Sequence, residues 1–245
     1  MNRLYVILIL LFPIISFNGC DEDELDKPTN VQFKVSMEEL EISDGKNLKI
    51  GKPMQIDDGR IAIESIEFDG TRENAKDYYF SRSFEKGLIG DLGQNKLNMD
   101  VTFDIPQGSY HPARISLQLG TVDSLSPIVL YGTYNHPTSE ETQVEFRFSK
   151  MNNEPIEIEL KIENTKGDKK VLFKKGKTKT LNIEVNLNPL FARFNPGTLN
   201  SATITQEGST RKIIISPNQN EEMYNELIDR IGIDRIDKLM KAVLK

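Results

Sequence analysis

Tryptophan is absent from this chain of 245 residues, histidine occurs twice and cysteine once. A single cysteine excludes an intramolecular disulfide, so stability must come from a hydrophobic core, for which the chain is long enough. The formal net charge of −6 argues against nucleic-acid binding by bulk electrostatics. No nucleophile elbow and no EF-hand loop occurs. GKT at 176–178 matches the end of a phosphate-binding loop, but Val171 stands where that motif needs its first glycine. We expect no cofactor.

The N-terminus has the features of a secretory signal. Met1 to Arg3 form a short positive start, and the fourteen residues from Leu4 to Phe17 are almost all apolar. This run is too short for a bilayer core, which needs about 20 residues, but it has the length of the apolar region of a signal peptide. Pro13 also argues against a stable spanning helix. We therefore expect residues 1–19 to be removed.

The residues around the only cysteine carry a resemblance. FNGC, residues 17–20, resembles the lipobox of bacterial lipoproteins, although Phe17 and Asn18 depart from the usual aliphatic and small residues. The resemblance implies that Cys20 is acylated and begins a mature chain of 226 residues, with a net charge of −7 once Arg3 is lost. The chain would then hang from its lipid in the outer membrane. The alternative is an ordinary cleaved signal followed by a chance cysteine.

Four acidic residues follow the cysteine directly. Asp21, Glu22, Asp23 and Glu24 resemble the acidic export signal of Bacteroidota lipoproteins, which implies display on the outer face of the outer membrane. The alternative is a solvated tether, because a run of like charges repels itself and stays extended. Both can hold together.

From Val31 onward, apolar residues alternate with polar ones, as in half-buried strands. In LNMDVTFDI, residues 97–105, every odd position is apolar and every even position polar. Such sheets must bury their apolar faces against each other, so we predict a mainly β fold, an antiparallel β-sandwich. In RIAIESIEF the apolar phase jumps between Ile63 and Ile66, which predicts a bulge near Ser65. The expected strands cover 31–35, 97–105, 113–119, 128–134, 144–148, 156–162, 171–173 and 181–187.

The apolar period changes after Leu187. Asn188 and Pro189 favour a short helical turn through Phe194. Residues 218–231 read as a helix with an Asn218–Glu221 capping box, ended by Gly232. A second helix is expected from Asp234, with Ile236, Leu239, Met240 and Val243 on one side. The predicted organisation is a signal peptide at 1–19, the lipidated Cys and acidic tether at 20–30, a β-sandwich domain at 31–187, and a C-terminal extension at 188–245 with a short strand and two short helices.

The segment DIPQGSYHPARISLQL, residues 104–119, is similar to the hairpin of an uncharacterised family of bacterial lipoprotein domains. The matching positions are Pro106, Gly108, Tyr110, Arg114 and Ile115. The resemblance implies a transthyretin-like or immunoglobulin-like sandwich and brings no catalytic residue. Independently of it, Pro106 fixes φ for a turn and Gly108 permits a positive φ. Tyr110 can bury its ring and hydrogen-bond its hydroxyl.

The two histidines are the weak candidates for a metal or acid–base site. In a meander, the 105–112 turn and the 135–143 loop lie at the same end of the sheet. His111 and His136 would then approach Asp104, Glu140 and Glu141. Their spacing matches no standard zinc pattern, and two solvated loop histidines are the simpler interpretation. Asp57–Asp58–Gly59 indicates a turn rather than a carboxylate pair.

Three further surface features stand out. A basic patch surrounds one predicted strand and would meet anionic glycan or lipid headgroups, or else guard a strand edge. Asp123–Ser124–Leu125 is similar to the O-glycosylation acceptor of Bacteroidota secreted proteins, with Ser124 as the acceptor. Tyr78 and Tyr79 are adjacent on a predicted strand, so one of them faces out and offers an aromatic surface. The lysines of the patch are Lys166, Lys169, Lys170, Lys174, Lys175, Lys177 and Lys179.

Three functions remain open on the sequence. The first is a non-enzymatic surface lipoprotein, anchored to the membrane, that binds or scaffolds a surface glycan or envelope protein. The second is a component or anchor of a surface fibre, which would show an unpaired terminal strand. The third is a hydrolase or metal-dependent enzyme that uses His111 and His136.

Overall fold

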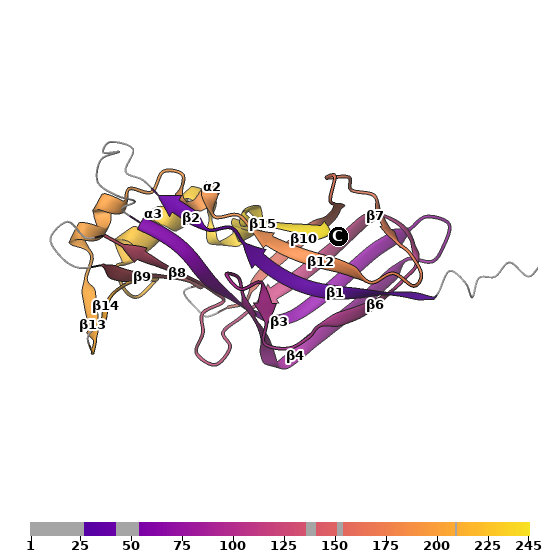
Figure 1. Ribbon diagram of the computed structural model, residues 1–245, viewed down its shortest axis with the longest axis horizontal. Coiled ribbons are helices and arrows are strands. Elements are labelled where there is room, and N and C mark those ends of the chain that lie inside the picture. Colours follow the sequence, from indigo (N-terminus) through magenta and orange to yellow (C-terminus); the bar gives the residue numbers. More distant parts are fainter. Residues whose placement is uncertain (1–26, 43–53, 136–140, 151–153, 209) are drawn as a thin grey trace, which may run out of the picture.

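The computed structural model describes residues 27–42, 54–135, 141–150, 154–208 and 210–245 (Figure 1). The described chain is mainly β, as predicted. Its strands are β1 Pro28–Met37, β2 Leu40–Ile42, β3 Met54–Arg72, β4 Tyr78–Asp91, β5 Lys96–Leu97, β6 Thr102–Pro106, β7 Gly108–Leu119, β8 Ile128–Tyr134, β9 Thr142–Phe148, β10 Ile156–Asn164, β11 Val171–Phe173, β12 Lys179–Val185, β13 Ile204–Glu207, β14 Thr210–Ile215 and β15 Met240–Leu244. The helices are α2 Asn188–Phe191 and α3 Glu221–Ile231, with 3₁₀ helices η1 Pro196–Ser201 and η2 Ile233–Leu239.

The 19-residue strand β3 joins the two halves of an elongated molecule (Figure 1). Its first half pairs with β8, and its second half pairs with β7. The main path of the sheet is β13-β14-β9-β8-β3-β7-β10-β15-β12-β1-β6. The short strands β2, β5 and β11, together with β4, branch from this path. Strands β8, β9, β13 and β14 therefore lie at one end of the molecule, and the start of β1 lies at the other.

The sheet is mixed, so the prediction of purely antiparallel pairing is wrong. Among the described strands, three pairs are parallel: β1 with β12, β10 with β15, and β9 with β14. Each joins strands far apart in sequence, because a parallel pair requires a long crossover. The alternation of apolar residues is the same in both kinds of pair. It therefore reveals a strand but not the direction of its neighbour.

The sheet curls so that its apolar faces enclose an aromatic core. Phe80 of β4 lies 4.7 Å from Phe103 of β6, measured between ring centroids, although no strand pairing joins these elements. Phe103 also contacts Phe33 of β1, and Phe80 stacks on Phe68 of β3. Phe33 and Phe68 are almost completely buried. Burial of these large rings, at about 25 cal/mol per Å², is the main stabilising term at this end.

The predicted bulge near Ser65 is confirmed. The pairing of β3 shifts register between Ile63 and Ser65 against both β4 and β7. The predicted turn at Asp57–Asp58–Gly59 is wrong, because these residues lie inside β3. A second register shift occurs there against β8, and Asp58 Oδ1 accepts a hydrogen bond from the Gly59 N–H at 2.7 Å. A bulge, like a turn, favours small and acidic residues, so the local sequence did not separate the two.

The segment around Pro106 is a corner between different parts of the sheet and not a hairpin. Strand β6 pairs with β1, whereas β7 pairs with β3, β10 and β11. The predicted local roles are confirmed: Gly108 has φ of +150°, the Tyr110 ring is fully buried, and its hydroxyl donates to the Pro106 carbonyl at 2.8 Å. The turn chemistry was therefore readable from the sequence, while the partner strands were not.

The C-terminal region contributes strands as well as helices. Gly232 ends α3, as predicted, but Asn220 rather than Asn218 stands at its start, with no side-chain cap. The Asn220 side chain instead donates to the Ile214 carbonyl at 2.7 Å. The predicted second helix is wrong beyond Leu239, because residues 240–244 form β15 between β10 and β12. Within the described residues, no helix is both long enough and apolar enough to cross a bilayer.

Candidate binding groove

The outer face of β1, β12 and β15 carries cross-strand rows of polar side chains. Strand β12 lies between β1 and β15, and its alternate residues Leu181, Ile183 and Val185 face the core. The residues between them therefore face outwards. The three rows are Gln32, Thr180 and Lys245; then Lys34, Asn182 and Glu163, with the buried Val243 between the last two; and then Ser36, Glu184 and Lys241.

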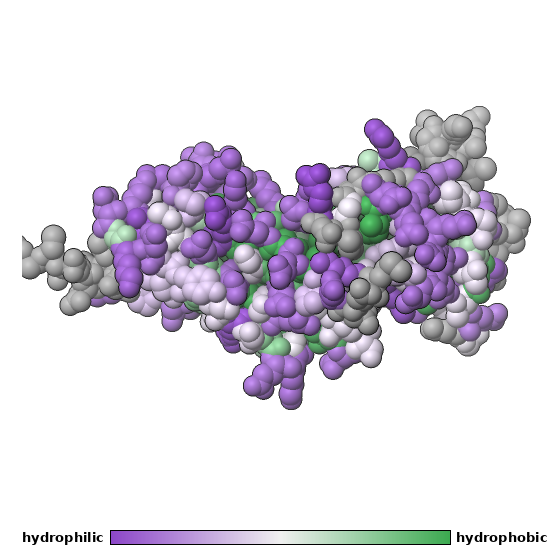
Figure 2. All heavy atoms as spheres, turned by 180° about the vertical axis from the view of Figure 1, so that it is seen from behind, coloured by the Kyte–Doolittle hydropathy of each residue, from purple (hydrophilic) through white to green (hydrophobic). Residues whose placement is uncertain are grey.

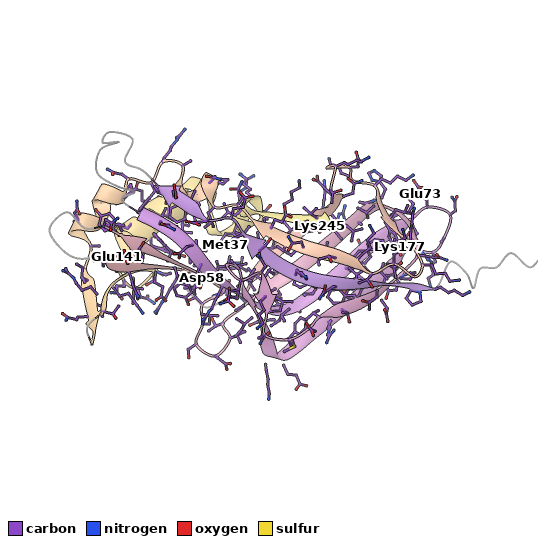
Figure 3. The ribbon with its side chains drawn as sticks, viewed as in Figure 1. Met37, Asp58, Glu73, Glu141, Lys177 and Lys245 are labelled. Carbon is purple, nitrogen blue, oxygen red and sulfur yellow. The ribbon has the colours of Figure 1, made fainter. Side chains whose placement is uncertain are left out.

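An open groove of about 970 Å³ lies over these rows. It extends along β12 from Thr180 to Val185, a distance of roughly 17 Å for five steps of an extended strand. Figure 3 labels Met37 and Lys245, which line its two ends. The lining residues outside the rows are Met37, Glu38, Asn95, Val185, Asn186, Lys238, Leu239 and Met240.

Opposite charges are paired across the groove floor. The Lys245 ammonium lies 2.7 Å from Glu184, and Lys241 lies 3.4 Å from Glu163. The Asn182 amide is nearly buried and donates to Ser36 Oγ at 2.9 Å and to Glu184 at 3.2 Å. Partial burial raises the pKa of Glu184, but the hydrogen bonds from Lys245 and Asn182 together outweigh it. The pKa of Glu184 is therefore below its ordinary value.

One end of the groove combines apolar and polar residues. Val185, Leu239 and Met240 border it but are almost completely buried, so the half-buried Met37 is the accessible apolar side chain there, beside Glu38, Asn186 and Lys238. The Asn186 N–H donates to the Leu239 carbonyl at 2.7 Å, which fixes the start of β15 against the end of β12. The groove therefore offers fixed hydrogen-bonding groups along its floor and the partly exposed Met37 at one end.

The structure does not bring the predicted histidine site together. Tyr110, beside His111, pairs with Arg72 at the last residue of β3, whereas Tyr134 pairs with Met54 at the first. A strand of that length spans roughly 60 Å, so Tyr110 and Tyr134 lie near opposite ends of the molecule. Figure 3 likewise shows Glu141 far from Glu73, which is the neighbour of Arg72.

His111 itself is exposed, and its Nδ1 lies 3.3 Å from the Lys169 carbonyl oxygen. His136 and Glu140 fall outside the described residues. Asp104 is on β6, where its backbone carbonyl accepts a hydrogen bond from the Tyr78 hydroxyl at 3.0 Å. Among the described residues, no three His, Cys, Asp or Glu side chains are grouped closely enough to hold a metal ion.

The predicted basic patch surrounds β11, which pairs with β7 and has no second partner among the described strands. Val171 and Phe173 are buried, while Leu172 between them is 46% exposed. Lys170 forms an ion pair of 2.7 Å with Glu73, and its hydrogen bond lowers the pKa of that carboxyl. The open edge agrees with the edge-guard interpretation of part of this patch.

The remaining predicted sites are not brought into the groove. Ser124 is exposed in a tight turn closed by backbone hydrogen bonds of 2.8 and 3.2 Å between Val122 and Leu125. Tyr79 is 59% exposed, which confirms that one of the two adjacent tyrosines faces out. Cys20 and the acidic residues Asp21, Glu22, Asp23 and Glu24 lie outside the described residues.

Sequence reasoning missed the groove because its rows come from three distant segments. Lys34 and Asn182 are paired neighbours but stand almost 150 positions apart. The only local signal was a pair of strands with short polar side chains on the outer face, at Ser36 and Asn182. That pattern is common on solvated sheets, so it did not indicate a site.

No protein-family model, no curated protein and no solved structure matches this chain.

Proposed function

We propose that this chain is a non-enzymatic surface lipoprotein of the outer membrane, anchored through Cys20, which binds an envelope polypeptide in the groove over β1, β12 and β15. The observation that carries the proposal is the groove itself. Its polar groups stand on neighbouring strands of one sheet, and the apolar side chain of Met37 is partly exposed at one end. Binding sites combine these two features, with the apolar part supplying affinity and a few placed polar groups supplying orientation.

A polypeptide suits this groove better than a glycan does. None of the sixteen lining residues is aromatic, whereas sugar rings usually stack on exposed aromatic platforms. The floor instead presents acid and base together, in Glu184 beside Lys241 and Lys245. A peptide backbone offers donors and acceptors in the same alternation, and one apolar side chain of it could fill the Met37 end.

The other two functions receive less support. An enzyme that uses both histidines would need the chain next to Tyr110 to meet the chain that follows Tyr134, although these two tyrosines pair with opposite ends of β3. Strand exchange in a fibre needs a terminal strand with an open edge. Here β1 pairs with both β6 and β12, and β15 pairs with both β10 and β12. The sandwich architecture stays part of the proposal, because the curl of the sheet packs Phe103 against Phe80 in the manner of two facing layers.

Photo-crosslinking in intact cells tests the proposed groove. A photoreactive amino acid replaces Thr180 in the groove and, as the matched control, Lys96 on β5. We expect a discrete polypeptide adduct from position 180 only, and its loss when Ser36→Trp fills the groove. Adducts with carbohydrate would show that the groove binds a glycan and not a polypeptide. Equal labelling at both positions, or none, would show that the groove is not a binding site.

A further inference from the structure

The described chain begins near strand β11, which lies between two lysine-rich turns. The Gln107 N–H donates to the Lys27 carbonyl at 3.1 Å, and the next residue, Gly108, pairs with Phe173 of β11. Lys174 therefore lies within roughly 18 Å of Lys27, adding cross-strand and chain spacings. On the other side, Val31 of β1 pairs with Lys179. Figure 3 shows Lys177 and Glu73 at this same end of the molecule.

The segment from Asn164 to Lys179 is strongly positive, whereas the rest of the chain is negative. It holds seven lysines and one aspartate, a formal charge of +6, in a chain of net charge −6. All of these lysines except Lys179 are classed as exposed. The two turns within it, at Gly167 and Gly176, project into open space, since an added Cβ at either glycine would meet nothing within 4 Å. Figure 2 shows hydrophilic residues over most of this end.

Guarding the open edge of β11 does not account for most of these lysines. A charge protects an edge when it stands on the strand itself. Lys166, Lys174, Lys175 and Lys177 instead occupy the turns on either side of a strand only three residues long. Between them, the exposed Leu172 adds an apolar side chain to the basic surface. Basic turns with a projecting leucine suit the polar–apolar boundary of a membrane.

We infer that the exposed lysines of 164–179, together with Leu172, dock on the anionic headgroups of the membrane that holds the lipid anchor. This rests on the proposed acylation of Cys20. Six residues separate Cys20 from Lys27, so their Cα atoms, seven chain steps apart, lie at most about 25 Å from each other. The anchor thus holds the lysines close to the headgroups, and contact brings them inside the Debye length of about 8 Å. The molecule then stands on its lysine end, with β8, β9 and β14 turned away from the membrane.

Vesicle flotation of an unacylated chain separates this docking from the anchor. Among the described residues, every buried apolar side chain belongs to the segment from Val31 to Leu244, so a chain that starts at residue 20 with Cys20→Ser keeps the described core. We expect it to bind vesicles of equimolar phosphatidylglycerol and phosphatidylcholine and to dissociate from them at high salt. It should not bind vesicles of pure phosphatidylcholine. Combined Lys169→Gln, Lys174→Gln and Lys177→Gln should weaken binding about 100-fold, since each lysine near the surface contributes about 1 kcal/mol.

The matched control carries Lys86→Gln, Lys96→Gln and Lys161→Gln, which remove the same charge elsewhere, and should bind like the parent chain. An equal loss in both triple variants, or no preference for anionic vesicles, would overturn the inference. Strong binding only after Asp21–Glu24 are replaced by Ser-Gly-Asn-Ser would also overturn it, because the acidic segment would then occupy the lysines. Mass spectrometry of the cellular protein reads acylation separately, so failure of the anchor is distinguishable from failure of the docking surface.

Discussion

The groove over β12 and the lysine end around β11 use charge in different ways. In the groove, acids and bases alternate across neighbouring strands, as in the pair of Glu184 and Lys245. At the lysine end, Lys170 has the acid partner Glu73, but the local formal charge remains strongly positive. A surface whose acids and bases are paired is stable without a ligand, and a charged ligand can replace one member of a pair. An unbalanced one is stabilised when an external negative charge approaches.

Under the proposed docking, the two regions also lie differently with respect to the membrane. The lysine end adjoins the first described residue, Lys27, whereas the groove lies along the side of the sheet. A membrane contact at one end leaves the groove face open to a partner. Variants that change the anchor, the lysine end or the groove separately test this difference.

Cys20→Ala should abolish stable anchoring and leave the chain uncleaved or unlipidated. Acyl chains contribute about 0.8 kcal/mol per buried CH₂, far more than the lysines can supply, so only weak salt-sensitive attachment should remain. The measurement is mass spectrometry of the N-terminal peptide together with membrane fractionation. A wild-type chain with a free, unmodified N-terminus downstream of Cys20 would contradict the proposed lipid anchor.

Replacing Asp21–Glu24 by Ser-Gly-Asn-Ser should keep the chain on the membrane but change the face on which it is displayed. A passive tether needs only polarity, whereas an export signal needs the charge itself. Protease added to whole cells should digest the wild type and spare the variant. Equal digestion would leave the acids with no role in export, and protection of both would place the groove on the periplasmic side.

The sequence predicted those features that depend on neighbours along the chain. The alternation around Phe103, the bulge at Ser65 and the buried Tyr110 with its bonded hydroxyl all follow from local residue types. Period alone did not separate a helix from a strand over 240–243, because Met240 and Val243 are buried in either case. Only the pairing of β15 with β10 and β12 decides it, and that depends on residues far away.

The site was harder to predict than the fold for the same reason. The groove needs Lys34, Asn182 and Lys241 to share one face, which follows from a parallel pair and an antiparallel pair of distant strands. The histidine site failed on topology as well, since β7 and β8 lie along different halves of β3. The lysine run, in contrast, is local in sequence, and the structure added where it lies relative to the chain start.

Gly108→Val should destabilise the corner that carries β11 by about 1–3 kcal/mol, because a β-branched residue at this positive φ is strained. A Cβ there would also lie 3.3 Å from the buried Arg72 side chain. Urea unfolding measures the loss, and Gly176→Asn in the open turn is the control, since Asn tolerates positive φ. Vesicle binding should weaken in Gly108→Val while crosslinking at Thr180 persists. An unchanged unfolding midpoint would contradict the strain at the corner.

Glu184→Gln, the smallest change, tests whether the groove charges are balanced internally. Both partners are more than one-third exposed, so solvent screens the pair and the expected loss is below about 1 kcal/mol. The pKa of Glu184 is lowered in the folded state, so its contribution is present above the ordinary value of 4.5 and disappears as the pH falls through the folded pKa. The difference between wild type and variant should therefore be largest at neutral pH and vanish in acid.

Urea unfolding at neutral and acidic pH measures this difference, with Glu157→Gln on the exposed face of β10 as control. Added salt should reduce it at neutral pH, because screening weakens an exposed pair. A difference that persists in acid would mean that Glu184 acts through shape or hydrogen bonding rather than charge. The charge-paired account of the groove would then fail, and with it the contrast to the lysine end. A difference confined to neutral pH would support pairing of the Glu184 charge by Lys245. A ligand would then need a positive group of its own to replace Lys245 beside Glu184.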